Sequence, residues 1–270
     1  MELGIFETVF TRPTLLDTFR AVKDAGFSCV QFDFASVGVA NQPEGITEAV
    51  AGQARDNASF AGIHISSVSG TFNMIHLNRG NRERGLIRLD AIAATCSTLG
   101  TGIVTLCTGT RDTDSMWRRH PDNESPGAWT DLVETMGRAL AIADRHQVRL
   151  VIEPEPANVV SDADLAFTFL EEMANPRLKI VLDPANILAG NPGRTPEAAL
   201  DHAFDLLGGQ IILAHAKDLD EEGTFCAAGT GIVPWAHYRR LLESISYNGD
   251  VIFHTLTEEQ ASSAKAVLTD

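Results

Sequence analysis

Four apolar runs in the sequence each end in a side chain that can bind a metal ion. The terminal side chains are Glu153, Asp183, His215 and His254. A charged or polar group at the end of an apolar strand is costly unless a partner there uses it. Carboxylates and imidazoles are ligands for Mg²⁺, Mn²⁺, Fe²⁺, Co²⁺ and Zn²⁺. The pattern therefore indicates a metal site, although a carboxylate in front of a helix also commonly serves as an N-cap.

Segments of helical length separate these runs. Apolar runs rich in β-branched residues, with a helix between them, predict parallel strands buried on both faces. The same alternation continues along the whole chain. We expect strands at 3–9, 29–34, 62–68, 103–108, 150–153, 178–183, 211–215 and 251–254. We expect helices at 14–25, 44–60, 79–99, 129–146, 162–174, 196–207, 235–246 and 258–268.

Eight such units in 270 residues predict an α/β fold, a single (β/α)8 TIM barrel over residues 1–270. An open, doubly wound sheet is the alternative, but no G-x-G-x-x-G turn follows the first expected strand. In a parallel barrel the carboxyl ends of the strands meet at one mouth, where active sites of this fold lie. We therefore expect the four metal-capable side chains to converge at that mouth.

The composition limits the classes of partner. Hydrophobic residues make up 44% of the chain and the formal net charge is −15. This acidity argues against nucleic acid or an anionic membrane as a partner. The four cysteines form no C-x-x-C pair, and the N-terminus lacks the pattern of a signal peptide. We expect a cytoplasmic protein with a small-molecule substrate, and we leave homo-oligomerisation open.

Three motifs give the sequence a family resemblance. They are Val151-Ile152-Glu153-Pro154-Glu155-Pro156, Val181-Leu182-Asp183-Pro184-Ala185-Asn186 and Ala214-His215-Ala216-Lys217-Asp218. In order and spacing they resemble the sugar phosphate isomerase/epimerase family, the xylose isomerase-like TIM barrels. That family also includes ketose 3-epimerases and endonuclease IV-type repair enzymes. The resemblance covers essentially the whole chain and implies one divalent metal ion at the mouth of the barrel.

In the epimerase branch, the resemblance implies Glu, Asp, His and Glu ligands at the ends of strands five to eight. The first three fall on Glu153, Asp183 and His215, and the fourth falls on His254 instead of a glutamate. The branch's epimerases use both metal-bound glutamates as acid and base on opposite faces of the substrate, and only one is kept here. Among Mn²⁺, Zn²⁺, Co²⁺, Fe²⁺ and Mg²⁺, we favour Mn²⁺.

Two glutamates are the candidates for proton transfer. Glu153 is the first, and Glu155 faces the same way two residues later in an extended backbone. Glu155 is equally compatible with a solvent-facing loop acid.

Six further residues are predicted substrate contacts. They are Lys217, Asn186, Arg111, Trp117, His76 and His120. Lys217 shares a face with His215, whereas a salt bridge with Asp218 is its structural alternative. Arg111, Trp117 and His120 lie in the long polar segment 109–127, and loops of that length are usually functional.

Together these features predict a divalent-metal-dependent isomerase or epimerase of a small sugar or sugar-derived keto compound. The metal would stabilise an enediolate while a carboxylate moves the proton. Because His254 replaces a glutamate, we expect chemistry on one substrate face. An enolate-forming lyase or decarboxylase of an oxo sugar acid remains an alternative, as does a non-catalytic sugar-binding barrel. An endonuclease IV-type hydrolase fits the acidic composition poorly.

Overall fold

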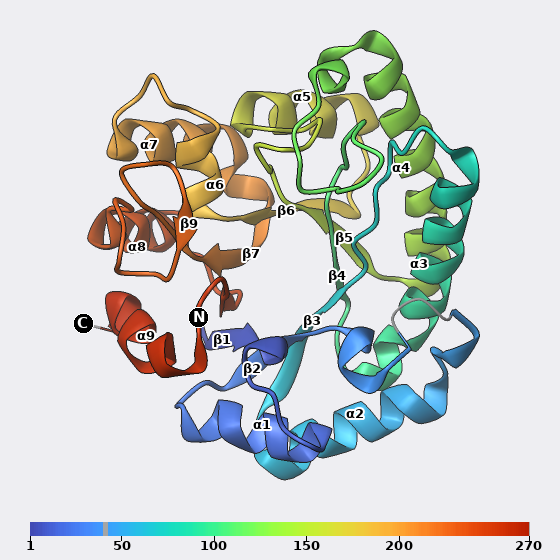
Figure 1. Ribbon diagram of the computed structural model, residues 1–270, viewed down its shortest axis with the longest axis vertical. Coiled ribbons are helices and arrows are strands. Elements are labelled where there is room, and N and C mark those ends of the chain that lie inside the picture. Colours follow the sequence, from blue (N-terminus) through green and yellow to red (C-terminus); the bar gives the residue numbers. More distant parts are fainter. Residues whose placement is uncertain (40–42, 270) are drawn as a thin grey trace.

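Eight parallel strands close into a barrel in the computed structural model, which describes residues 1–39 and 43–269 (Figure 1). Their order around the barrel is β1-β10-β7-β6-β5-β4-β3-β2. The strands are β1 (Leu3–Phe6), β2 (Cys29–Phe32), β3 (His64–Ser69), β4 (Ile103–Leu106), β5 (Arg149–Ile152), β6 (Leu178–Leu182), β7 (Ile211–Ala216) and β10 (Val251–Phe253). The predicted (β/α)8 barrel is confirmed.

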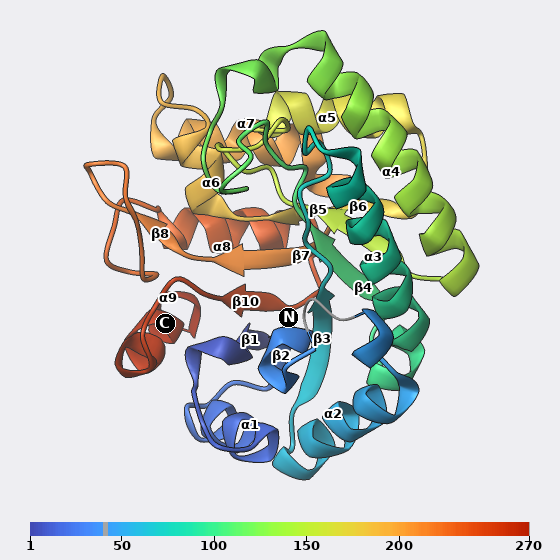
Figure 2. The ribbon, with the colours of Figure 1, turned by 45° about the vertical axis from the view of Figure 1, so that its right-hand side comes forward.

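Helices form a ring outside the strands, as Figures 1 and 2 show. They are α1 (Leu15–Asp24), α2 (Glu48–Ala61), α3 (Arg79–Leu99), α4 (Pro126–His146), α5 (Ala163–Met173), α7 (Pro196–Leu207), α8 (Trp235–Ser244) and α9 (Ala261–Thr269). Thr14, Thr47, Ser125 and Thr195 cap α1, α2, α4 and α7 by accepting backbone N–H groups. None of the helices in the described ranges is long and apolar enough to cross a membrane.

Several predicted boundaries are wrong for local reasons. The helix expected from residue 44 begins at Glu48, because Thr47 is its N-cap. The helix expected from residue 129 begins at Pro126, because Ser125 caps it and proline suits the first helical position. The first strand ends at Phe6 and continues as a 3-10 turn, Glu7–Val9.

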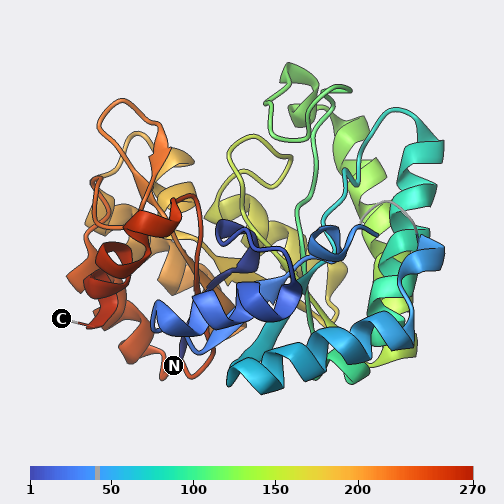
Figure 3. The ribbon, with the colours of Figure 1, turned by 60° about the horizontal axis from the view of Figure 1, so that its bottom comes forward.

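Two small elements at the mouth were not predicted. A short helix, α6 (Pro184–Ala189), directly follows β6. An antiparallel hairpin of β8 (Asp218–Leu219) and β9 (Phe225–Cys226) follows β7. In Figure 3 this orange hairpin and the green segment after β4 rise at the same end of the barrel.

Side chains inside the barrel are arranged in layers. Cys29, Val151, Val181, Leu213 and Ile252 form one buried apolar cluster. Because side chains alternate along a strand, the residues two positions later face the same interior, nearer the strands' carboxyl ends. Those residues are Gln31, Glu153, Asp183, His215 and His254. The apolar layer therefore supports a polar layer directly above it.

Candidate metal and substrate site

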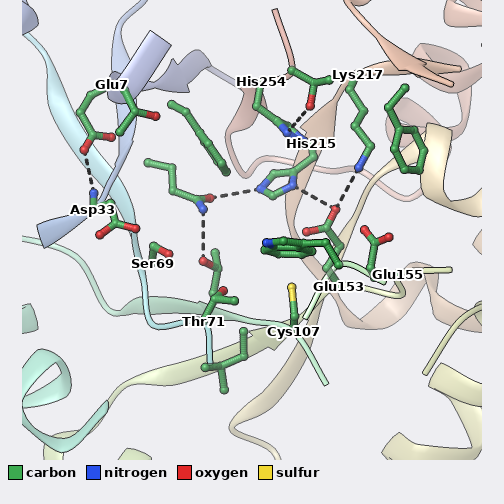
Figure 4. Close-up of a pocket in the computed structure, with 18 residues that line it drawn as sticks. Glu7, Asp33, Ser69, Thr71, Cys107, Glu153, Glu155, His215, Lys217 and His254 are labelled. Carbon is green, nitrogen blue, oxygen red and sulfur yellow. Dashed lines mark hydrogen bonds and ion pairs between the residues drawn. The ribbon is translucent and has the colours of Figure 1, made fainter. Parts of the chain in front are cut away.

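The four predicted metal ligands converge in the polar layer. One ligand atom from each of Glu153, Asp183, His215 and His254 lies within 4.8 Å of the others. Glu153, Asp183 and His254 directly follow β5, β6 and β10, while His215 lies within β7. Figure 4 shows Glu153, His215 and His254 around the same cavity. Their predicted convergence is confirmed.

A buried hydrogen-bond chain orients His215. Its Nε2 lies 3.1 Å from Gln31 Oε1. Ser67 donates to the same oxygen, and Gln31 Nε2 donates to Thr105 Oγ1. Because Gln31 presents an acceptor, the ring proton belongs on Nε2. The other nitrogen, Nδ1, is buried without a hydrogen-bond partner and lies 3.4 Å from Glu153 Oε1.

Asp183 is held by one oxygen and presents the other. Its Oδ1 accepts the N–H groups of Ala185 and Asn186 at the start of α6. Its Oδ2 lies 3.0 Å from His254 Nε2 and 3.5 Å from Lys217 Nζ. Burial would raise the pKa of Asp183, but Lys217 and the hydrogen bond from His254 outweigh it and hold that pKa below its usual value.

Two further contacts hold Glu153 and His254, the other two predicted ligands, in place. Asn186 Nδ2 donates to Glu153 Oε1 at 2.7 Å, so this predicted substrate contact supports a ligand instead of lining the cavity. The ring of Phe6 stacks on His254 with 4.9 Å between centroids and meets His215 edge-on. Burial lowers the pKa of His254, which favours the neutral imidazole that metals bind.

This set of residues fits a divalent cation. A metal-bound histidine usually donates its second ring N–H to a protein acceptor, as His215 does to Gln31. That arrangement leaves the unpartnered Nδ1 directed at Glu153, while Asp183 Oδ2 contacts His254 and Lys217. Two carboxylates and two imidazoles match the ligand preferences of Mn²⁺, Fe²⁺, Co²⁺ and Zn²⁺.

A cavity of about 510 Å³ opens above this group, within the usual range for small-molecule sites. Six of the predicted site residues line it, namely Glu153, Glu155, His215, Lys217, His254 and Trp117. Trp117 is 58% exposed and lies at the solvent side. Burial raises the pKa of Glu155 to about 7.

Lys217 is buried between the carboxylates. Its Nζ lies 3.8 Å from Glu153 Oε1 and 4.3 Å from the ring centre of Phe225 in β9. Burial would lower the pKa of Lys217, but Asp183, Glu153 and Glu155 together raise it, so the side chain is charged.

Asp218 is not the partner of Lys217. It accepts the N–H groups of Gly229, Val233 and the Trp235 indole. The segment 229–235 is therefore held to the fold by hydrogen bonds to the Asp218 carboxylate.

Besides Asn186, three other predicted substrate contacts do not line the cavity. Arg111 Nη1 donates to Ile75 O at 2.6 Å and pairs with Asp131 at 2.8 Å. His120 caps the 3-10 turn Pro121–Glu124. His76 accepts the Asn78 N–H through Nδ1 and contacts Asn81 through Nε2. The structure does not bring these side chains to the metal group, and their binding roles remain predictions without support from the cavity.

The opposite wall of the cavity contains acids that the sequence analysis missed. Glu7 and Asp33 lie there, across from Glu153 and Glu155 in Figure 4. Glu7 is 1% exposed and its Oε1 accepts the Asp33 N–H at 2.8 Å. Burial raises the pKa of Glu7 to about 8. Both residues directly follow apolar strands, so the strand-end pattern used for the metal ligands would also have found them.

Known proteins share this architecture. The family model of the xylose isomerase-like TIM barrel matches residues 19–269. The structure of 3-keto-D-glucoside 4-epimerase, YcjR, from E. coli is similar with a TM-score of 0.77 and 17% identity, covering 100% of this chain and 99% of that chain. The structure of D-Psicose 3-epimerase with D-tagatose, from Clostridium cellulolyticum H10, is similar with a TM-score of 0.78 and 15% identity. The match covers 100% of this chain and 98% of that chain.

A third similar structure, IOLI protein with a bound zinc atom, gives a TM-score of 0.73 and 16% identity, covering 100% of this chain and 95% of that chain. At these identities the likeness concerns the fold, and function has to be argued from the site. No curated protein matches the sequence.

Proposed function

The chain belongs to the xylose isomerase-like TIM barrel family, and on that premise we propose that it is a divalent-metal-dependent isomerase or epimerase of a small polyhydroxylated carbonyl compound. The convergence of Glu153, Asp183, His215 and His254 within 4.8 Å at the base of a cavity carries this proposal. The sugar epimerases among the similar structures agree with it.

Glu153, Asp183, His215 and His254 would hold the ion, for which Mn²⁺ remains our preference over Zn²⁺, Co²⁺, Fe²⁺ and Mg²⁺. When bound, such an ion supplies Lewis-acid polarisation of a substrate carbonyl, which acidifies the neighbouring C–H. Gln31 and Asn186 would keep His215 and Glu153 in their ligating orientation.

Glu153 and Glu155 are the proposed proton carriers. Their surroundings differ, and they favour Glu155 as the mobile base and Glu153 as a metal ligand. Glu153 accepts from Asn186 and faces both Lys217 and His215, which fixes its carboxylate as a ligand. Glu155 lines the cavity, and within the described ranges it has no ion-pair partner within 4.0 Å. Its carboxylate is free to take a proton from a substrate carbon and return it, as a general base requires.

Lys217 is the proposed electrophilic partner of the substrate. Its ammonium faces the cavity between the carboxylates and packs on Phe225, which limits its movement. From this place it would donate a hydrogen bond to a substrate oxygen that gains negative charge, which is where preorganised donors contribute most. Trp117 offers an apolar face at the entrance.

The charges of the walls favour an unphosphorylated substrate. Glu7, Asp33, Glu153 and Glu155 all line the cavity. Among the described residues that line it, Lys217 is the one lysine or arginine, and carboxylates already surround it. A phosphate dianion would therefore meet carboxylates and an ammonium that they already pair with, and the proposed metal ion, itself held by carboxylates, would be the remaining cation in the cavity.

An enolate-forming lyase is the second candidate, and His254 is the observation that favours it. A neutral imidazole engaged through Nε2 provides no carboxylate on the second face of the substrate. Proton removal from one face, followed by loss of a leaving group, needs only one mobile base.

Solvent-deuterium exchange tests the proposal. Chelator-treated protein is reloaded with Mn²⁺ and incubated in D₂O with free ketoses and with their phosphate esters, and label at carbon is followed by NMR. We expect metal-dependent labelling of free ketoses that Glu155→Gln reduces at least about 100-fold, within the range for general-base catalysis. Absence of exchange from all substrates would refute the enzymatic proposal, and a preference for phosphate esters would refute the substrate class.

A further inference from the structure

A second group of metal-binding side chains lies at the opposite mouth of the barrel. One ligand atom from each of Cys29, His64 and Asp250 lies within 4.8 Å of the others. His64 Nε2 and Asp250 Oδ2 are 3.1 Å apart. Cys29 and His64 begin β2 and β3, and Asp250 directly precedes β10. This cluster therefore lies at the amino ends of the strands, away from the cavity.

Neighbouring strands hold these residues in register. Cys29 is the register partner of His64, so the two side chains share one face of the sheet. Asp250 lies two residues before Ile252, which belongs with Cys29 to the apolar interior layer. Strands β10, β1, β2 and β3 are consecutive in the barrel, as Figure 2 shows. Cys29 therefore belongs both to the apolar layer and to this cluster, and the rest of the layer lies between the polar groups at the two mouths.

The surroundings of the cluster resemble those of a metal-binding histidine. Glu2 Oε2 lies 4.0 Å from His64 Nδ1, on the side of the ring away from Asp250. At 4.0 Å this is an ion-pair contact and not a hydrogen bond, but it puts a carboxylate near the second ring nitrogen, where metal-binding histidines usually have one. The hydroxyl of Tyr247 donates to the Asp250 carbonyl at 2.6 Å and fixes that backbone. The His64 side chain is 50% exposed and Cys29 is fully buried, so His64 lies on the solvent side of the cluster and the thiol lies beneath it.

We propose that Cys29, His64 and Asp250 form a zinc-binding site at the amino-terminal mouth, independent of the proposed activity. Sulfur, nitrogen and oxygen ligands together suit Zn²⁺, while a thiolate disfavours Mg²⁺ and Mn²⁺. Binding forms bonds from zinc to Cys29 Sγ, His64 Nε2 and an Asp250 oxygen, and the thiol proton leaves to solvent. Water completes the tetrahedron.

The site would join the last strand to the second and third across β1, where the barrel closes. Linking these strands stabilises the closed form, in keeping with the structural role of this face in such barrels.

An ordinary surface ion pair beside a core cysteine is the competing explanation. The chain provides a matched example, because His202 Nε2 lies 2.9 Å from Asp164 Oδ2 without belonging to a described metal-capable group. The pair His202–Asp164 therefore serves as the control.

Zinc content decides between the two explanations. Chelator-treated protein is incubated with excess Zn²⁺, freed of unbound ion, and analysed for zinc per folded chain. We expect His64→Ala to lose one equivalent relative to wild type and His202→Ala to lose none. Equal zinc in wild type and both variants would overturn the proposal. His64 is half exposed, so its replacement is compatible with folding.

Cobalt identifies the ligand itself. Co²⁺-loaded protein should show a thiolate-to-cobalt charge-transfer band that Cys29→Ser abolishes and Cys107→Ser retains. Cys107 is the necessary control because it lines the cavity at the other mouth of the barrel, beside the proposed Mn²⁺ site. A band that depends on Cys107 alone, or no thiolate band in folded wild-type protein, would also overturn the proposal.

Discussion

Two of the predicted ligands, Asp183 and His215, each use one side-chain atom in a hydrogen bond to the protein and direct the other toward the site. Asp183 gives one oxygen to α6 and keeps the other for the site. His215 gives Nε2 to Gln31 and keeps Nδ1. His215 Nδ1 is buried without a hydrogen-bond partner, and such an atom carries a free-energy cost that a bound ligand removes.

Glu7 should control the pH dependence of stability. Burial raises its pKa from 4.5 to about 8, so the folded state binds a proton that the unfolded state releases between these values. The stabilisation is complete below pH 4.5, declines as the pH rises and is lost above about 8. Relative to Glu7→Gln, metal-free wild type should lose up to about 1.4 kcal/mol of unfolding free energy per pH unit in this window.

Urea unfolding at several pH values measures this difference. Glu197→Gln, on the exposed first turn of α7, is the control and should keep the wild-type slope. Parallel pH profiles for wild type and Glu7→Gln would show that Glu7 is ionised in the folded protein throughout.

At the scale of elements, the loops after the strands hold the site through buried polar anchors. Asp218 accepts N–H groups from Leu219, Gly229, Val233 and the Trp235 indole. It thereby ties the β8–β9 hairpin to the start of α8.

Asp218→Ala should therefore lower the unfolding free energy by roughly 3 kcal/mol or more, because it leaves several buried donors unpaired. Asp220→Ala, in the exposed turn of the same hairpin, should cost less than about 1 kcal/mol. Urea denaturation compares the two. Equal and small effects would mean that Asp218 does not anchor the hairpin.

The strands and most helices could be predicted from the sequence, whereas α6 and the contacts of the long loop could not. Apolar runs with intervening helix-length segments predicted the barrel, since burial on both faces leaves a strong signal. The polar residue at the end of each run then placed Glu153 and Asp183 at the mouth of the barrel. The short helix α6 was missed because Asp183 and Pro184 start it within what reads as a turn. Arg111 and His120 found structural partners that only the folded loop reveals.

For the whole molecule, the barrel separates polar groups at its two mouths by one apolar layer. The group of Glu153, Asp183, His215 and His254 lies beneath the cavity at the carboxyl ends of the strands. The group of Cys29, His64 and Asp250 lies at their amino ends. A formal charge of −15 favours cations at both places. The fold thus provides a rigid frame on which strand ends bring distant residues together.

The central claim is that Glu153, Asp183, His215 and His254 bind a divalent metal ion. Mn²⁺ binding tests it most directly, because Mn²⁺ suits carboxylate and imidazole ligands and not a thiolate site. Free and bound Mn²⁺ are measured by EPR in titrations of wild type, Asp183→Ala and His215→Ala, with His202→Ala as the control. The account predicts one bound ion per chain in wild type and the control, and at least a tenfold loss of affinity in both site variants while circular dichroism remains native. Unchanged Mn²⁺ affinity in folded Asp183→Ala and His215→Ala would contradict it.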